Sequence, residues 1–118
     1  MSTKFGHIEL FVKDPLKSKD FYVDILGFNL DVIQHNKLVW LYKEDKIVML
    51  RPGSPANDAK NYQSASAGYV LYTDDLEAEA ANLRSLGLEF KGTDGSDSCL
   101  TFTDPDGNWF QLVDPAHA

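Results

Sequence analysis

The chain has 118 residues, of which 43% are hydrophobic and 25% are charged, the composition of an ordinary globular domain. This length predicts a single domain, and no apolar run approaches the roughly 20 residues that a membrane-spanning helix needs. Eighteen acidic against 11 basic residues give a net charge of −7, which argues against nucleic-acid binding because phosphate recognition needs a basic surface.

Cysteine usage and the N-terminal residues bear on the cellular compartment. Cys99 is the only cysteine and therefore has no partner for an internal disulfide, so it reads as a small buried hydrophobe. The N-terminal residues lack the basic and then apolar pattern of a signal peptide. We therefore expect a cytoplasmic protein without a membrane partner.

The first half begins with an alternating apolar strand at residues 8–12. A helix is predicted next, because Asp14 is a natural N-cap, Pro15 suits the first helical position and Gly27 can end the helix in a left-handed conformation. Short strands are expected to complete this half at residues 29–34, 38–42 and 47–51.

The second half follows a stretch rich in Pro, Gly, Ser, Ala and Asn, which predicts a linker over residues 52–66. A new strand and then a helix are expected, with Asp74 or Thr73 as the N-cap and Gly87 at the helix end. Further strands are predicted at residues 89–92, 99–102 and 109–113. The acidic segment 104–108 is explained by turn chemistry and is expected to be structural.

An internal repeat connects the two halves. A shift of 60 residues aligns segment 26–30 with segment 86–90, and Asp14 with Asp74. The same order of strand, capped helix, glycine and three strands then occurs twice. The sequence therefore predicts an α+β fold made of two tandem βαβββ modules.

Three motifs carry a resemblance to a known family: GHIEL at 6–10, FYVDILGF at 21–28 and FTDPDGNWFQL at 102–112. With the tandem repeat, they resemble the vicinal-oxygen-chelate superfamily of glyoxalases, extradiol dioxygenases, and fosfomycin- and bleomycin-resistance proteins. The resemblance implies one domain over residues 1–118, with modules at about 4–51 and 67–115. It further implies a curled mixed-sheet cup with helices on the outside, and a homodimer.

The resemblance also indicates where a divalent metal would bind. Metal-dependent members take ligands from the first and last strands of each half, and these positions fall on His7, Met49, Ala67 and Gln111. A thioether and a methyl group are poor ligands for such an ion. Glu9, on the same strand face as His7, is an available substitute ligand. We therefore expect a degenerate metal site and no cofactor, with His7 and Gln111 as the residual ligands.

Without a metal, the predicted cup remains a candidate binding site for a small molecule. Strand alternation places Trp40 with Tyr42 and Trp109 with Gln111, and Tyr69 is expected to point inward as well. The candidate ligand-binding residues are His7, Glu9, Trp40, Tyr42, Arg51, Tyr69, Trp109 and Gln111. Arg51 suits a carboxylate or phosphate, whereas the net charge favours a cationic ligand, and the sequence leaves both open.

Three functions follow in order of preference. The first is a small-molecule-binding or sequestering protein similar to the bleomycin-resistance type. The second is a metal-dependent lyase or dioxygenase of the glyoxalase type, with His7 and Gln111 as ligands and Glu9 as catalytic base or third ligand. The third is a protein-association domain whose cup is filled by its own side chains.

Overall fold

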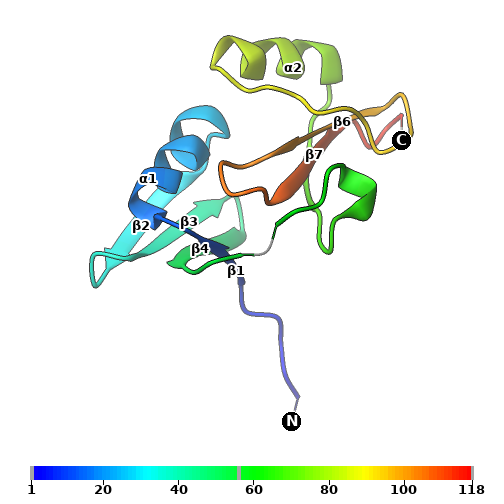
Figure 1. The fold of residues 1–118 in the computed structure, drawn as a ribbon. Coiled ribbons are helices and arrows are strands. Elements are labelled where there is room, and N and C mark those ends of the chain that lie inside the picture. The colour runs from blue at the N-terminus through cyan, green and yellow to red at the C-terminus, as the bar shows by residue number, and fades with distance from the viewer. Residues whose placement is uncertain (1, 56, 118) are drawn as a thin grey trace. The chain divides into compact units, whose positions relative to one another are not determined.

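A computed structural model describes residues 2–55 and 57–117 (Figure 1). The chain divides into two compact units, and the boundary after Pro55 lies inside the predicted linker. Each unit is described below by itself. Within the described residues, no helix has the length and apolar character needed to cross a membrane.

The first unit follows the predicted order of strand, helix and three strands. Its elements are β1 (Ile8–Val12), α1 (Pro15–Asp20), the π-helix η1 (Phe21–Ile25), β2 (Asn29–Gln34), β3 (Leu38–Lys43) and β4 (Lys46–Pro52). The sheet has the order β1-β4-β3-β2, in which β1 is parallel to β4 and the other pairs are antiparallel. Parallel pairing of the first and last strands brings residues 40 positions apart side by side.

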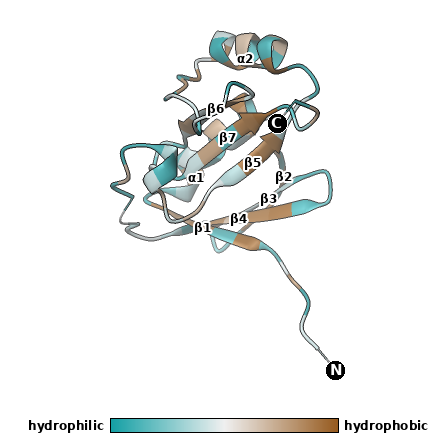
Figure 2. Ribbon diagram, turned by 90° about the vertical axis from the view of Figure 1, so that its right-hand side faces the viewer, coloured by the Kyte–Doolittle hydropathy of each residue, from teal (hydrophilic) through white to brown (hydrophobic). Residues whose placement is uncertain are grey.

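Opposite faces of this sheet have different environments. The core face carries aliphatic residues that are almost fully buried, including Leu10, Val12, Val39, Leu41 and Leu50. Helix α1 packs on this side against β3 and β4. The alternate positions form the other face, called the open face below, and begin with His7 and Glu9 on β1. Figure 2 shows how hydrophobic residues concentrate in the strands.

Asp14 caps α1 as predicted, because its side chain accepts hydrogen bonds from the backbone N–H groups of Leu16 and Lys17. The helix does not remain α-helical up to Gly27, however. From Phe21 onward it widens into η1, where the Leu26 N–H donates to the Phe21 carbonyl five residues earlier. A π-turn of this kind holds one residue more than an α-turn.

The second unit contains η2 (Tyr62–Ser64), β5 (Tyr69–Tyr72), α2 (Leu76–Ser85), β6 (Cys99–Thr103) and β7 (Trp109–Val113). Its sheet has the order β5-β7-β6, with β5 parallel to β7 and β6 antiparallel to it. The predicted strand at 89–92 was wrong. Segment 91–92 makes two backbone hydrogen bonds to Thr101, and then Gly92, at φ +92°, turns the chain away before a ladder can form.

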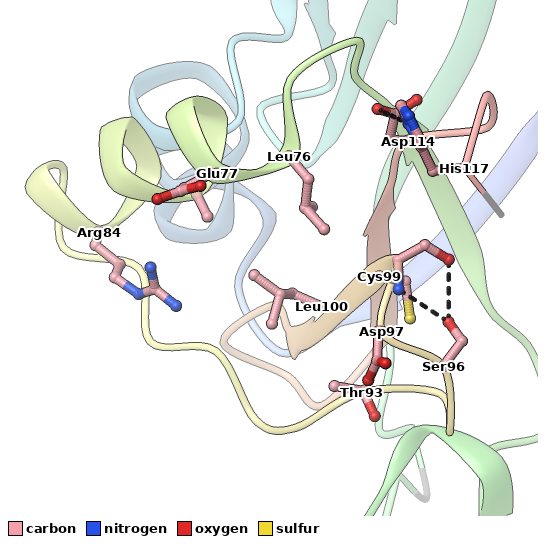
Figure 3. A pocket seen from close by; sticks show the side chains of 12 residues that line it. Leu76, Glu77, Arg84, Thr93, Ser96, Asp97, Cys99, Leu100, Asp114 and His117 are labelled. Atoms are coloured by element: carbon pink, nitrogen blue, oxygen red, sulfur yellow. Dashed lines mark hydrogen bonds and ion pairs between the residues drawn. The ribbon is translucent and has the colours of Figure 1, made fainter.

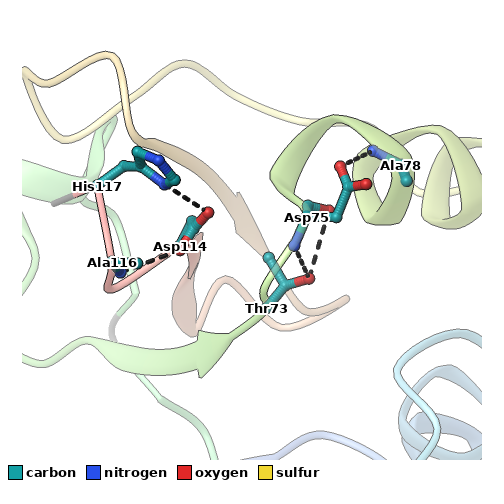
Figure 4. A network of polar contacts seen from close by, with 6 residues as sticks. All are labelled: Thr73, Asp75, Ala78, Asp114, Ala116 and His117. Carbon is teal, nitrogen blue, oxygen red and sulfur yellow. Dashed lines mark hydrogen bonds and ion pairs between the residues drawn. The ribbon is translucent and has the colours of Figure 1, made fainter.

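The cap of α2 also differs from the prediction by one residue. Asp75, rather than Asp74 or Thr73, caps the helix by accepting from the Ala78 N–H at 3.0 Å (Figure 4). Thr73 supports the cap, because its hydroxyl accepts from the Asp75 N–H. The two helix caps, Asp14 and Asp75, are therefore 61 residues apart.

The glycines that end the helices, Gly27 and Gly87, are nevertheless 60 residues apart, and the extra residue of η1 accounts for the difference. Upstream of η1 the true repeat is thus 61 residues. Strand register agrees, since Glu9 pairs with Met49 in the first unit and Val70 with Gln111 in the second. Hence the counterpart of His7 is Gly68 and not the predicted Ala67, which lies in the loop before β5.

The predicted α+β class is confirmed by two mixed sheets with helical segments, and the first unit is a complete βαβββ module. The second unit lacks one strand of that pattern within the described residues. A curled cup would involve both sheets together and stays a prediction, as does the single-domain organisation.

Candidate functional site

Three polar side chains form a connected group on the open face of the first unit. His7 Nε2 lies 2.8 Å from Glu9 Oε2, and Arg51 Nη1 donates to Glu9 Oε1, also at 2.8 Å. Their side chains are 28%, 32% and 41% exposed for His7, Glu9 and Arg51, so all three remain accessible. The parallel pairing of β1 with β4 makes this contact possible across 42 positions of sequence.

Trp40 extends this group onto β3. Its ring centroid lies 4.7 Å from that of His7 at an interplanar angle of 57°, and its indole Nε1 donates to Gln34 Oε1 at 2.8 Å. Met49 pairs in register with Glu9 on one side and Trp40 on the other, and it is only 3% exposed. We call His7, Glu9, Trp40 and Arg51 the open-face cluster.

The electrostatics of the cluster centre on Glu9. The Arg51 hydrogen bond, followed by that of His7, lowers the pKa of the Glu9 carboxyl below its ordinary value of 4.5, while desolvation opposes this shift. The guanidinium of Arg51 also lies over the Phe11 ring, 5.6 Å from its centroid. Glu9 is thus an ionised anchor that holds one imidazole and one guanidinium in place.

A pH dependence follows from this lowered pKa. Because folding lowers the Glu9 pKa, its ionised form stabilises the fold above pH 4.5, and this contribution is lost as the pH falls through the folded-state value. Urea unfolding of wild type and Glu9→Gln should therefore differ most at neutral pH and converge in acid.

Asp45→Asn is the matched control, since the pKa of Asp45 is also lowered, by Lys46, but in a strongly exposed pair. Exposed pairs contribute little to stability, so this variant should follow wild type at every pH. A gap between wild type and Glu9→Gln that widens as the pH falls would contradict the assigned role of Glu9.

The second unit covers the corresponding region with its own linker. Tyr62, in η2, receives a hydrogen bond from Gln111 Nε2 at 3.1 Å and packs edge-on against Trp109. A Cβ atom at Gly68 would overlap the Tyr62 ring and hydroxyl. Tyr62 therefore occupies the space at the counterpart of His7, and the sequence analysis, which treated the linker only as a connector, missed it.

Gln111 retains one unused polar atom in this arrangement. Its Oε1 is buried and has no hydrogen-bond partner among the described residues. Buried acceptors are normally satisfied, so a donor from water or a bound molecule would be favourable here. Trp109 is 4% exposed and its Nε1 donates to the Ala59 carbonyl, which places it in the core beneath the linker.

Tyr69 does not lie where the sequence analysis expected it. It pairs with Phe110 in the parallel β5–β7 ladder, and their rings are 5.3 Å apart, so Tyr69 is on the opposite sheet face from Gln111. Burial, followed by the charge of Asp104, raises the pKa of the Tyr69 phenol. Tyr42, in contrast, is exposed on the open face of the first unit, two residues from Trp40.

The acidic turn 104–108 is structural, as predicted. Asp104 is 2% exposed, and its carboxylate accepts from the Asp106 N–H, the Asn108 N–H and the Asn108 side-chain amide. Asn108 in turn accepts from the side chain of Asn57 at 3.1 Å. The turn thus fastens the start of the linker.

A cleft of about 830 Å³ lies beside α2 and β6 in the second unit (Figure 3). Leu76 and Leu100 point into it from the helix and the strand. Cys99 borders the cleft as a buried thiol, and burial raises its pKa, which makes it a weak nucleophile. The Asp114–His117 pair stands at its rim.

The side chains at the family's metal positions do not form a suitable donor set. Met49 offers a soft thioether, Gly68 has no side chain, and the nearest nitrogen of His7 is already paired with Glu9. Gln111, the remaining position, belongs to the other unit. Within the residues that the structure describes, no three His, Cys, Asp or Glu side chains gather as a metal site would require.

Comparison with known proteins gives a family match. The model of the Glyoxalase/Bleomycin resistance protein/Dioxygenase superfamily matches residues 4–112. No curated protein matches the chain significantly.

Solved structures share the fold at low identity. FosX, a fosfomycin resistance protein from Listeria monocytogenes complexed with Mn(II) and sulfate, is 18% identical with a TM-score of 0.75, covering 97% of this chain and 91% of its own. UcmS2 is 25% identical, TM-score 0.70, with 97% and 99% coverage. Lactoylglutathione lyase from Agrobacterium tumefaciens is 16% identical, TM-score 0.71, with 96% and 94% coverage.

Proposed function

The chain belongs to the glyoxalase/bleomycin resistance protein/dioxygenase superfamily, and we propose that it acts there as a small-molecule-binding protein without a catalytic metal. The observation that carries this proposal is the open-face cluster. It combines a pinned aromatic ring, an imidazole and a guanidinium on one accessible sheet face, a composition typical of small-molecule sites.

Preorganisation supports binding by this cluster. Trp40 is held at its indole nitrogen by Gln34 and at its ring by His7, and Arg51 is held by Glu9 and Phe11. Groups that are already fixed lose little conformational entropy when a ligand binds. The same internal bonds occupy Glu9, which would otherwise be the base or additional metal ligand of a glyoxalase-type enzyme.

A fluorescence screen tests the proposal, because the chain has two tryptophans in different settings. Trp109→Phe leaves Trp40 as the reporter, and Trp40→Phe leaves the buried Trp109. A library of small organic molecules should contain compounds that change the emission of Trp109→Phe in a saturable way and leave Trp40→Phe unchanged. If every responding compound acts equally on both variants, the proposed site is wrong.

Metal retention separates this function from the enzymatic alternative. Tag-free protein would be incubated with Mn(II), Ni(II), Zn(II) or Fe(II), dialysed, and analysed by mass spectrometry for bound metal. We expect retention well below one ion per chain for each of them. Stoichiometric retention that is lost in His7→Ala would instead support a metal-dependent lyase or dioxygenase, as in relatives such as the Mn(II)-bound FosX.

The homodimer and the cytoplasmic location expected from the sequence are part of the proposal and are open to direct measurement. Sedimentation of the purified chain would determine the oligomeric state. Fractionation of the source cells would determine the compartment.

A further inference from the structure

We propose that the ligand of the open-face cluster is a small molecule that joins a flat ring to an oxyanion, such as a carboxylate or phosphonate. This inference rests on the proposed function and adds the chemical class of the ligand. It removes the ambiguity between anionic and cationic ligands that the sequence left open.

Charge within the cluster favours an anion. Both oxygens of Glu9 are engaged, one by His7 and one by Arg51, so its negative charge is already balanced inside the protein. Arg51 carries five N–H donors and uses one of them on Glu9, and its side chain is 41% exposed. The guanidinium is therefore the group with spare, accessible hydrogen-bonding capacity, and its planar fork matches an oxyanion.

The acidity of the chain does not apply to this unit. Residues 1–55 contain eight basic and seven acidic residues, a net charge of +1. Residues 56–118 contain three basic and eleven acidic residues, a net charge of −8. The two sum to the −7 of the whole chain, so the argument for a cationic ligand concerns the second unit and not the sheet that carries Arg51.

The aromatic part of the ligand follows from Trp40. Its register partner on β4 is Met49, and Arg51 lies two residues further along the same strand face. Strand spacing and rise place the Trp40 and Arg51 backbones roughly 8 Å apart. A ring that stacks on Trp40 can therefore carry its oxyanion to Arg51 through a link of a few bonds.

Matched probes test the ligand class with the full-length chain. Naphthylacetate and naphthylmethylphosphonate present the two oxyanions, naphthylacetamide removes the charge, and naphthylethylamine reverses it. Binding is followed by the NMR shift of the Trp40 indole N–H, assigned with the Trp40→Phe variant. We expect the carboxylate or the phosphonate to bind about tenfold or more tightly than the amide, and the amine to bind most weakly.

Variants at the two arginines complete the test. Arg51→Gln should reduce the oxyanion-to-amide affinity ratio to near one, and Arg51→Lys should restore it only in part because the planar fork is lost. Arg84→Gln, on α2 of the second unit, is the matched control and should leave the ratio unchanged. The amide serves as an internal reference, because any general damage to the sheet would weaken both probes together.

The outcomes separate the two proposals. Amine or amide binding that equals or exceeds oxyanion binding overturns the ligand class and leaves the binding function intact. A Trp40 signal that no probe perturbs overturns the proposed function at this site. An oxyanion preference that persists in Arg51→Gln assigns the recognition to another residue and contradicts the inference.

Discussion

Asp104→Ala is expected to lower the free energy of unfolding by about 3 kcal/mol, a large effect for one substitution. The carboxylate of Asp104 is buried and accepts three hydrogen bonds within the turn that joins β6 to β7. Alanine would leave the Asp106 and Asn108 N–H groups without this acceptor. The closing backbone bond of the turn, from the Asp104 N–H to the Asn108 carbonyl, would lose its support as well.

Urea unfolding followed by circular dichroism measures this loss directly. Asp104→Asn keeps one acceptor oxygen and should cost about half as much. Asp97→Ala replaces an exposed acid in the loop before β6 and should stay within about 0.5 kcal/mol of wild type. An Asp104→Ala protein as stable as Asp97→Ala would contradict the structural role assigned to the turn.

Gly68→Ala is expected to cost about 2 kcal/mol, although the backbone conformation of Gly68 does not require glycine. The cost arises because the added methyl group would overlap the Tyr62 side chain, which packs over the Gly68 backbone. Tyr62 would then have to leave its position, and its contacts with Gln111 and Trp109 would be lost.

A double-mutant cycle isolates this cause. In a Tyr62→Ala background the methyl group meets no ring, so Gly68→Ala should add little further destabilisation. Gly6→Ala is the control, since nothing lies within 4 Å of a Cβ at that position. Additive costs for Gly68→Ala and Tyr62→Ala would show that the two residues do not compete for the same space.

Local signals made most of the fold predictable. Asp14 and Pro15 begin α1, Gly27 and Gly87 end the two helices at positive φ, and the alternating strands start and end within a residue or two of their predicted limits. These features depend on residues close in sequence. The strand at 89–92 failed because pairing depends on a partner strand, and the turn at Gly92 leaves only a short contact with β6.

The candidate site was predictable where strand alternation alone decided it. His7 and Glu9 share a face with Trp40 and Arg51 as expected, although the bonds between them come from the parallel β1–β4 pairing. The error at Tyr69 has one source, the 60-residue shift. With the true shift of 61 residues, Tyr69 matches Ile8 rather than Glu9, and a one-residue slip moves a strand side chain to the other face.

The π-helix η1 has a consequence for how such a chain can change its length. One residue inserted into a regular α-helix would rotate all that follows by about 100° and take the apolar stripe off the sheet. In η1 the additional residue is absorbed within one wide turn, and Gly27 still ends the segment as Gly87 ends α2. A protein built from two copies of one module can thus accept an insertion in one copy alone, without disturbing the strands on either side.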